Sequence, residues 1–158
     1  MSNEKYITRL CMGECSMGTM KNYLNLPEDH GVLFNDMDHP IMNANDHEGG
    51  EGKNVVHFGR CNSKTNPGNI GQSIIGTLIP GSMFLKKLMG CGGCKCTPMT
   101  FMPWLEDKKE HLIEGAPALT DKSKLMCFYG GVITIVPPDE AKEDEAAYNE
   151  AEHKEYDE

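Results

Sequence analysis

The stretch S-K-L-M-C-F-Y-G-G-V-I-T-I-V-P, residues 123–137, holds the two signals that decide the fold. Residues 132–136 are all β-branched and form the clearest strand in the chain, which Pro137 and Pro138 end. Just before this strand, Cys127 is followed by Gly130 and Gly131. The stretch therefore predicts a β-strand beside a cysteine that is presented by a glycine-rich turn.

Three further cysteines stand in similar short signatures far apart along the chain. Cys15 begins C-S-M-G, Cys61 lies in H-F-G-R-C-N-S, and Cys96 lies in C-K-C-T-P. No local zinc-finger or redox motif spaces single thiols so widely. If these thiols meet in space, the fold closes around them, and one metal ion or a pair of disulfides fastens a small domain together.

The composition favours one small β-rich domain with a modest core. Only 39% of the 158 residues are hydrophobic and 7% are aromatic, whereas there are 17 glycines and 9 prolines. Abundant glycine and proline favour short strands and turns over long helices. A core with few aromatic side chains is a reason to expect an added fastener such as a metal.

The cysteines are expected to be thiolate ligands more readily than disulfides. The chain has no apolar stretch long enough to span a bilayer and no basic-then-apolar leader, so we expect it to be made in the cytoplasm. Disulfides are rare in that reducing compartment, and the count of seven cysteines is odd.

Nearly all of the net charge of −9 lies at the C-terminal end. Residues 137–158 hold ten acidic residues and two lysines, which leaves about −1 for the rest of the chain. No basic face is available to neutralise phosphates, so nucleic acid is not an expected partner. We therefore predict a folded domain over residues 1–137 and an acidic tail, flexible or helical, over residues 138–158.

Two segments read as strand, turn, proline and strand, namely residues 32–42 and residues 111–119 with a turn at Glu114 and Gly115. The N-terminal segment reads as extended structure broken at Gly13 and Gly18. Apolar residues recur at helical spacing over residues 70–79, and residues 83–89 add a turn or two, so we expect one or two short helices. The similar hairpins also suggest repeated units around an approximate symmetry axis.

A structural metal site is the favoured chemistry. Zinc takes four nitrogen or sulfur ligands in a tetrahedron, and the glycine- and proline-flanked turns favour one set of cysteines as its ligands. This set is Cys15, Cys61, Cys96 and Cys127. Alternative ligands are Cys91, Cys94, His39, His47, His57 and His111. The plainer alternative is that some of these thiols are small buried apolar side chains.

No pattern of catalytic residues is evident. The chain has no G-x-S-x-G, no H-E-x-x-H and no phosphate-binding P-loop. A cysteine nucleophile paired with His57 or His111 is conceivable, but no third residue stands out to orient the pair. A protein that is not an enzyme is therefore expected. The alternative is a small metal-dependent enzyme or secreted toxin, while a thiol redox protein is disfavoured because no convincing C-x-x-C begins a helix.

An ordered series of motifs resembles one known family. The series is C-S-M-G, F-G-R-C-N-S-K-T-N-P, L-I-P, C-T-P-M-T-F-M-P-W, I-E-G-A-P-A-L and S-K-L-M-C-F-Y-G-G-V-I-T-I-V-P. Over residues 6–137 it resembles the PAAR-like spike-tip family, long catalogued as a domain of unknown function, of type VI secretion and related contractile injection systems. Met17 and Phe128-Tyr129 depart from that pattern.

The resemblance implies a fold and a role. It implies a small, mainly β cone with approximate threefold pseudo-symmetry, which sits as a monomer on a trimeric VgrG-like spike protein and sharpens it. A structural zinc ion would stiffen the point, held by Cys15, Cys61, Cys96 and Cys127 where the wider group uses mostly histidines. Such a protein waits in the cytoplasm and is then delivered outside the cell or into a target, with transient membrane contact. It also attaches an effector or chaperone in some cases.

Overall fold

The structure is a computed structural model that describes residues 4–34, 39–69 and 93–136. Within these residues the chain forms eight short strands and is mainly β, as the sequence predicted. The strands are β1 (Met12–Cys15), β2 (Asn22–Tyr23), β3 (Arg60–Cys61), β4 (Cys94–Lys95), β5 (Lys108–Ile113), β6 (Ala116–Ala118), β7 (Lys124–Met126) and β8 (Val132–Ile135).

The central sheet has four antiparallel strands in the order β2-β1-β8-β7. Its two middle strands, β1 and β8, come from opposite ends of the described chain and pair from Gly13↔Ile135 to Cys15↔Ile133. The strand predicted over residues 132–136 is therefore confirmed, and β8 covers all but its last residue. Along β8 Ile133 and Ile135 are buried, because alternate side chains of a strand point to the same face.

One predicted break in the N-terminal segment is wrong and the other is right. Gly13 lies inside β1 instead of ending it. A Cβ at this position would lie 3.4 Å from both Leu24 Cδ2 and the Thr134 carbonyl oxygen, so glycine here allows close packing. Gly18 does end a turn, since its amide donates to the carbonyl of Cys15 at 2.9 Å.

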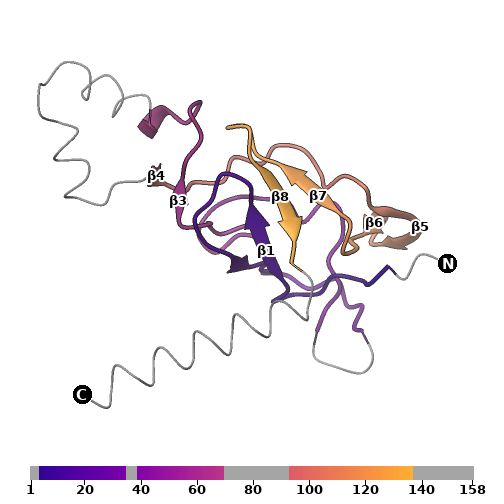
Figure 1. The fold of residues 1–158 in the computed structure, drawn as a ribbon. Helices are drawn as coiled ribbons and strands as arrows, with labels where there is room; N and C mark the ends of the chain where they lie inside the picture. Colours follow the sequence, from indigo (N-terminus) through magenta and orange to yellow (C-terminus); the bar gives the residue numbers. More distant parts are fainter. Residues whose placement is uncertain (1–3, 35–38, 70–92, 137–158) are drawn as a thin grey trace, which may run out of the picture.

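Two small antiparallel ribbons, β3–β4 and β5–β6, lie toward opposite ends of the central sheet (Figure 1). The turn between β5 and β6 has positive φ angles at Glu114 (50°) and Gly115 (80°), the conformation of a two-residue hairpin turn of type I′. The hairpin predicted over residues 111–119 is thus confirmed. The hairpin predicted over residues 32–42 is also present, as the antiparallel bridge Leu33↔Pro40.

The main core contains both apolar side chains and thiols. Trp104, the single tryptophan, is 1% exposed and donates its indole N–H to the Asp46 carbonyl at 2.9 Å. Phe58, Cys61 and Cys96 are buried in the same cluster. Because the core has few aromatic side chains, sulfur fills part of its volume.

Several expectations lie outside the described residues. The helices predicted over residues 70–89 and the acidic tail over residues 138–158 are among them. Residues 67–69 are helical, with Pro67 in the first turn and Asn66 as the cap, whose Oδ1 accepts from the Gly68 amide at 3.1 Å. Threefold pseudo-symmetry stays a prediction. None of the described segments forms a helix with the length and apolarity needed to cross a bilayer.

A half-buried histidine links two loops away from the central sheet. His30 binds the Asp46 carboxylate through Nε2 at 2.9 Å and the Glu114 carboxylate through Nδ1 at 2.7 Å. Burial lowers the pKa of His30, but the hydrogen bonds to Asp46 and Glu114 outweigh this effect, so the pKa lies above its ordinary value of 6.5. The imidazolium form, which donates from both nitrogens, is thus favoured by folding.

This network predicts a pH-dependent contribution to stability. A raised pKa in the folded state stabilises the protein fully below pH 6.5, and the contribution is lost as the pH rises through the folded-state pKa. We expect His30→Gln to lower the free energy of unfolding by roughly 2 kcal/mol at about pH 5.5, and by much less at about pH 8.5. Denaturant unfolding of both proteins at the two pH values measures this difference. His39→Gln, at an exposed position, is the control. A difference that does not shrink at the higher pH would contradict the assignment.

Candidate functional site

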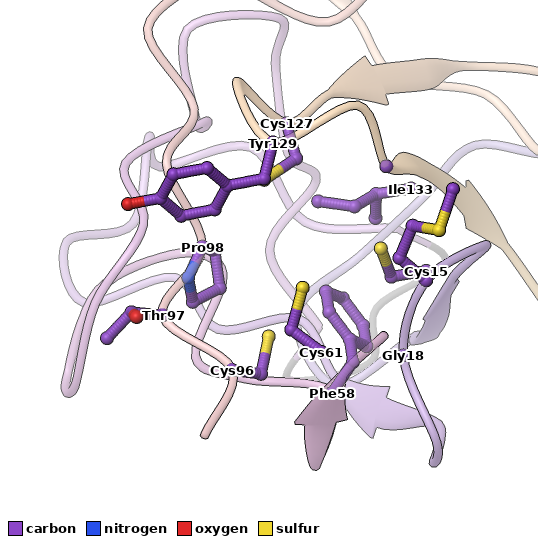
Figure 2. Close-up of a pocket in the computed structure, with 12 residues that line it drawn as sticks. Cys15, Gly18, Phe58, Cys61, Cys96, Thr97, Pro98, Cys127, Tyr129 and Ile133 are labelled. Carbon is purple, nitrogen blue, oxygen red and sulfur yellow. The ribbon is translucent and has the colours of Figure 1, made fainter. Parts of the chain in front are cut away.

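Four cysteines from separate parts of the chain line one small pocket: Cys15, Cys61, Cys96 and Cys127. Figure 2 shows the sulfur atoms of Cys15, Cys61 and Cys96 directed into a common space, with Cys127 across from Cys61 and Cys96. The free volume of the pocket is about 10 Å³, about the space that one water molecule needs. The structure thus brings together the four cysteines that the sequence singled out, around a space for a single small species.

Cys15 and Cys127 each begin a glycine-containing turn at an end of the central sheet. Cys15 is the last residue of β1, and its carbonyl accepts from the Gly18 amide. Cys127 follows β7; its amide donates to the Gly131 carbonyl at 2.8 Å, and its carbonyl accepts from the Gly130 amide at 2.9 Å. Gly130 has a φ of +84°, which favours glycine. The glycines in these signatures therefore shape the turns that present the thiols.

Cys61 and Cys96 come from the β3–β4 ribbon. Cys61 ends β3, and Cys96 directly follows β4, with its amide donating to the Gly59 carbonyl at 3.0 Å. Gly59 has a φ of +74°. Both cysteines are buried, at 6% and 8% exposure, so their sulfur atoms are held on the inner face of the ribbon.

Glycine also makes room at the sulfur atom of Cys15. A Cβ on Gly131 would lie 2.7 Å from Cys15 Sγ, closer than atoms in van der Waals contact. Phe58, Pro98 and Tyr129 form other parts of the wall. The sequence pattern indicates a glycine-rich turn at this place. It does not indicate the contact of Gly131 with Cys15, because that contact depends on the pairing of β1 with β8.

Electrostatics links the four thiols. Burial raises the pKa of Cys15, although the backbone amides of Met17 and Gly18 act in the opposite direction. Burial also raises the pKa of Cys96. A hydrogen bond from the backbone of Phe58 acts against this increase, and the charges of the other three pocket thiols add to it. Reactive cysteines have lowered pKa values, so neither thiol has the character of an activated nucleophile.

The donors fit a thiolate-bound metal ion, although they do not yet form its coordination shell. Within residues 4–34, 39–69 and 93–136, no three His, Cys, Asp or Glu side chains could hold a metal ion as they stand. A cysteine sulfur moves by rotation about one side-chain bond, which has three staggered positions. Four soft sulfur donors suit zinc, which takes them tetrahedrally.

The alternative ligands lie elsewhere. His47 Nδ1 is 3.3 Å from the Thr100 carbonyl, His57 Nδ1 accepts from the Gly59 amide at 3.2 Å, and His111 Nδ1 is 2.8 Å from the Tyr6 hydroxyl. The remaining histidine of that group, His39, is exposed. The pocket is lined by none of these four histidines.

The other two candidate thiols are Cys94 and Cys91, of which the structure describes Cys94. Cys94 is half-buried on β4 outside the pocket, and Cys91 lies outside the described residues. Among the candidate ligands that the structure describes, the four favoured cysteines alone line the pocket.

The comparisons with known proteins give a family. No curated protein and no solved structure matches this chain. One family model, described as a domain of unknown function (DUF4280), matches residues 8–139. The matched region contains all four pocket cysteines and every described strand. The chain therefore belongs to the DUF4280 family.

Proposed function

We propose that this chain is a non-enzymatic spike-tip protein, which caps and sharpens a trimeric VgrG-like spike of a type VI secretion or related contractile injection system. The single observation that carries the proposal is the convergence on one pocket of four cysteines, two that end β1 and β3 and two that directly follow β4 and β7. The ordered motifs of the chain resemble the PAAR-like family, whose tips hold a structural metal. The description of the matched family carries no function, so this assignment goes beyond it.

A zinc ion at the pocket would act as a crosslink. Cys15, Cys61, Cys96 and Cys127 would hold it, and when bound it supplies cohesion between segments that share only a small core. The pocket's volume of about 10 Å³ suits a single ion. Four protein ligands would leave no open position on the ion for a water or substrate, which favours this structural role over a metal-dependent enzyme or toxin.

The spike-binding base would lie at the end of the domain away from the thiols. The β5–β6 hairpin lies at the opposite end of the central sheet from β3–β4 (Figure 1). Here Leu112 is 59% exposed and Phe34 is 41% exposed, and the ring of Tyr6 is 6.4 Å from that of Phe34. Exposed apolar groups beside a strand ribbon suit docking onto a β-rich spike. In the same proposal the protein attaches an effector or chaperone in some cases, and the injection apparatus delivers it out of the cell.

The first prediction concerns metal content. We expect close to one zinc ion per chain in protein purified under reducing conditions, and we expect Cys61→Ser or Cys96→Ser to weaken zinc binding on the order of 100-fold or more. Elemental analysis and chelator competition measure these quantities. Cys11→Ser is the control, because Cys11 is a free, half-buried thiol that lies outside the pocket. A zinc-to-protein ratio near zero would contradict the site.

The second prediction uses the contact between Gly131 and Cys15. Gly131→Ala places a methyl group 2.7 Å from the present position of Cys15 Sγ, so the sulfur must rotate away while the backbone stays folded. We expect about 10-fold weaker zinc binding with a retained fold. Gly13→Ala is the control, since its methyl group would meet Leu24 and Thr134 at 3.4 Å and no cysteine. Equal zinc affinities in the two variants would argue against Cys15 as a ligand.

The third prediction tests the partner. The purified chain is expected to co-purify with a trimeric VgrG-like spike protein or to sediment with assembled injection particles. The double variant Phe34→Ser/Leu112→Ser should lose most of this binding. Phe128→Ser removes an even more exposed ring, at 74%, beside the thiol pocket, and should bind normally. The proposal fails if the unaltered chain neither co-purifies with the spike protein nor sediments with injection particles. If only Phe128→Ser abolishes binding, the β5–β6 end is not the surface that binds the spike.

A further inference from the structure

A fifth thiol lies on the same ribbon as two of the pocket cysteines. In the β3–β4 ribbon Cys61 is the direct partner of Cys94, and Arg60 is the partner of Lys95. Side chains directly opposite each other in an antiparallel pair share one face, and alternate residues of one strand share it too. Cys94 therefore lies on the face that carries Cys61 and Cys96, although it does not line the pocket.

The backbones of Cys61 and Cys94 are held together by one side chain. Asn69 donates from Nδ2 to the Cys61 carbonyl at 2.7 Å and accepts at Oδ1 from the Cys94 amide at 2.8 Å. The backbone of Gly68 packs closely beside Cys94, since a Cβ built on Gly68 would lie 2.8 Å from Cys94 Cβ and 3.0 Å from its Sγ. Cys94 thus occupies a fixed position opposite Cys61.

This arrangement is close to that of a disulfide. Directly opposed residues have Cβ atoms about 4.5–5.5 Å apart, and a disulfide needs about 3.5–4.5 Å between them. Both thiols are free in the structure. Cys94 is half-buried, whereas Cys61 is only 6% exposed, so an oxidant from solvent reaches Cys94 first.

We infer that Cys61 and Cys94 form a cross-strand disulfide when the protein meets a peroxide. The peroxide oxidises the Cys94 thiol to a sulfenic acid: its O–O bond breaks, an S–O bond forms and one water leaves. The Cys61 sulfur then attacks the Cys94 sulfur, forming the S–S bond and expelling a second water. In total the two thiols lose two electrons and two protons, and hydrogen peroxide is reduced to two waters.

Once it is part of the disulfide, Cys61 would no longer be one of the pocket thiols that can bind a metal ion. In a zinc-loaded protein this removes one of four ligands and releases the ion, a consequence that rests on the proposed function. The disulfide itself rests on the strand register alone. The two are therefore measured separately, by peptide mass and by zinc release, and a chain without zinc still tests the disulfide.

The full chain is treated with increasing hydrogen peroxide, its remaining thiols are alkylated, and it is digested with trypsin without reduction. Trypsin cuts after Arg60, Lys64, Lys87 and Lys95, so Cys61 alone lies in residues 61–64, while Cys94 lies in residues 88–95 together with Cys91. Mass spectrometry is expected to show these two peptides linked at the lowest effective peroxide concentration. Fragment ions distinguish Cys94 from Cys91.

Cys94→Ser and Cys94→Ala should both abolish the linked peptide and leave Cys61 alkylated, whereas Cys11→Ser should leave the linkage intact. Circular dichroism confirms the fold of each variant. The inference is overturned if Cys61 of the unaltered chain is linked first to another cysteine. It is also overturned if Cys61 stays alkylated while Cys94 proceeds to a sulfinic acid.

Discussion

The pairing of β1 with β8 is the constraint on which the rest of the structure depends. It joins strands from opposite ends of the described chain and sets Cys15 opposite Ile133. This register places Cys15 Sγ against Gly131, at the turn that carries Cys127. With a one-residue slip, alternate side chains would exchange faces, and Cys15 would point away from the other thiols. The site therefore depends on the correct closure of the sheet.

Sulfur has two roles in this small domain. Cys61 and Cys96 are part of the main buried cluster with Phe58 and Trp104, so they contribute to packing even without a ligand. The same two thiols face Cys15 and Cys127 across a space for one small species. A crosslink placed there would join the four segments that meet at the pocket, which would add cohesion to a core with few aromatic residues.

The two ends of the domain differ in chemistry. The end with β3–β4 carries the pocket thiols Cys61 and Cys96, and Cys94 lies there opposite Cys61. The end with β5–β6 carries the exposed side chains of Leu112 and Phe34 and the ionic contacts of His30 with Asp46 and Glu114, while the exposed ring of Phe128 lies beside the thiol pocket. Fastening at one end and docking at the other fit the proposed tip, because the narrow end of such a body has the least core to hold it.

The sequence alone determined the local features. The β-branched run predicted β8, the turn at Glu114 and Gly115 predicted the β5–β6 hairpin, and the glycine-flanked signatures identified Cys15, Cys61, Cys96 and Cys127. The predictions of β8 and of the β5–β6 hairpin succeeded because strand propensity and turn geometry depend on neighbouring residues. The tertiary structure alone decided the place of Gly13 inside β1, the contact of Gly131 with Cys15, the partners of His30 and the pairing of Cys94 with Cys61. Each of these depends on segments that lie far apart in the chain, and no local pattern encodes which distant backbone will lie opposite.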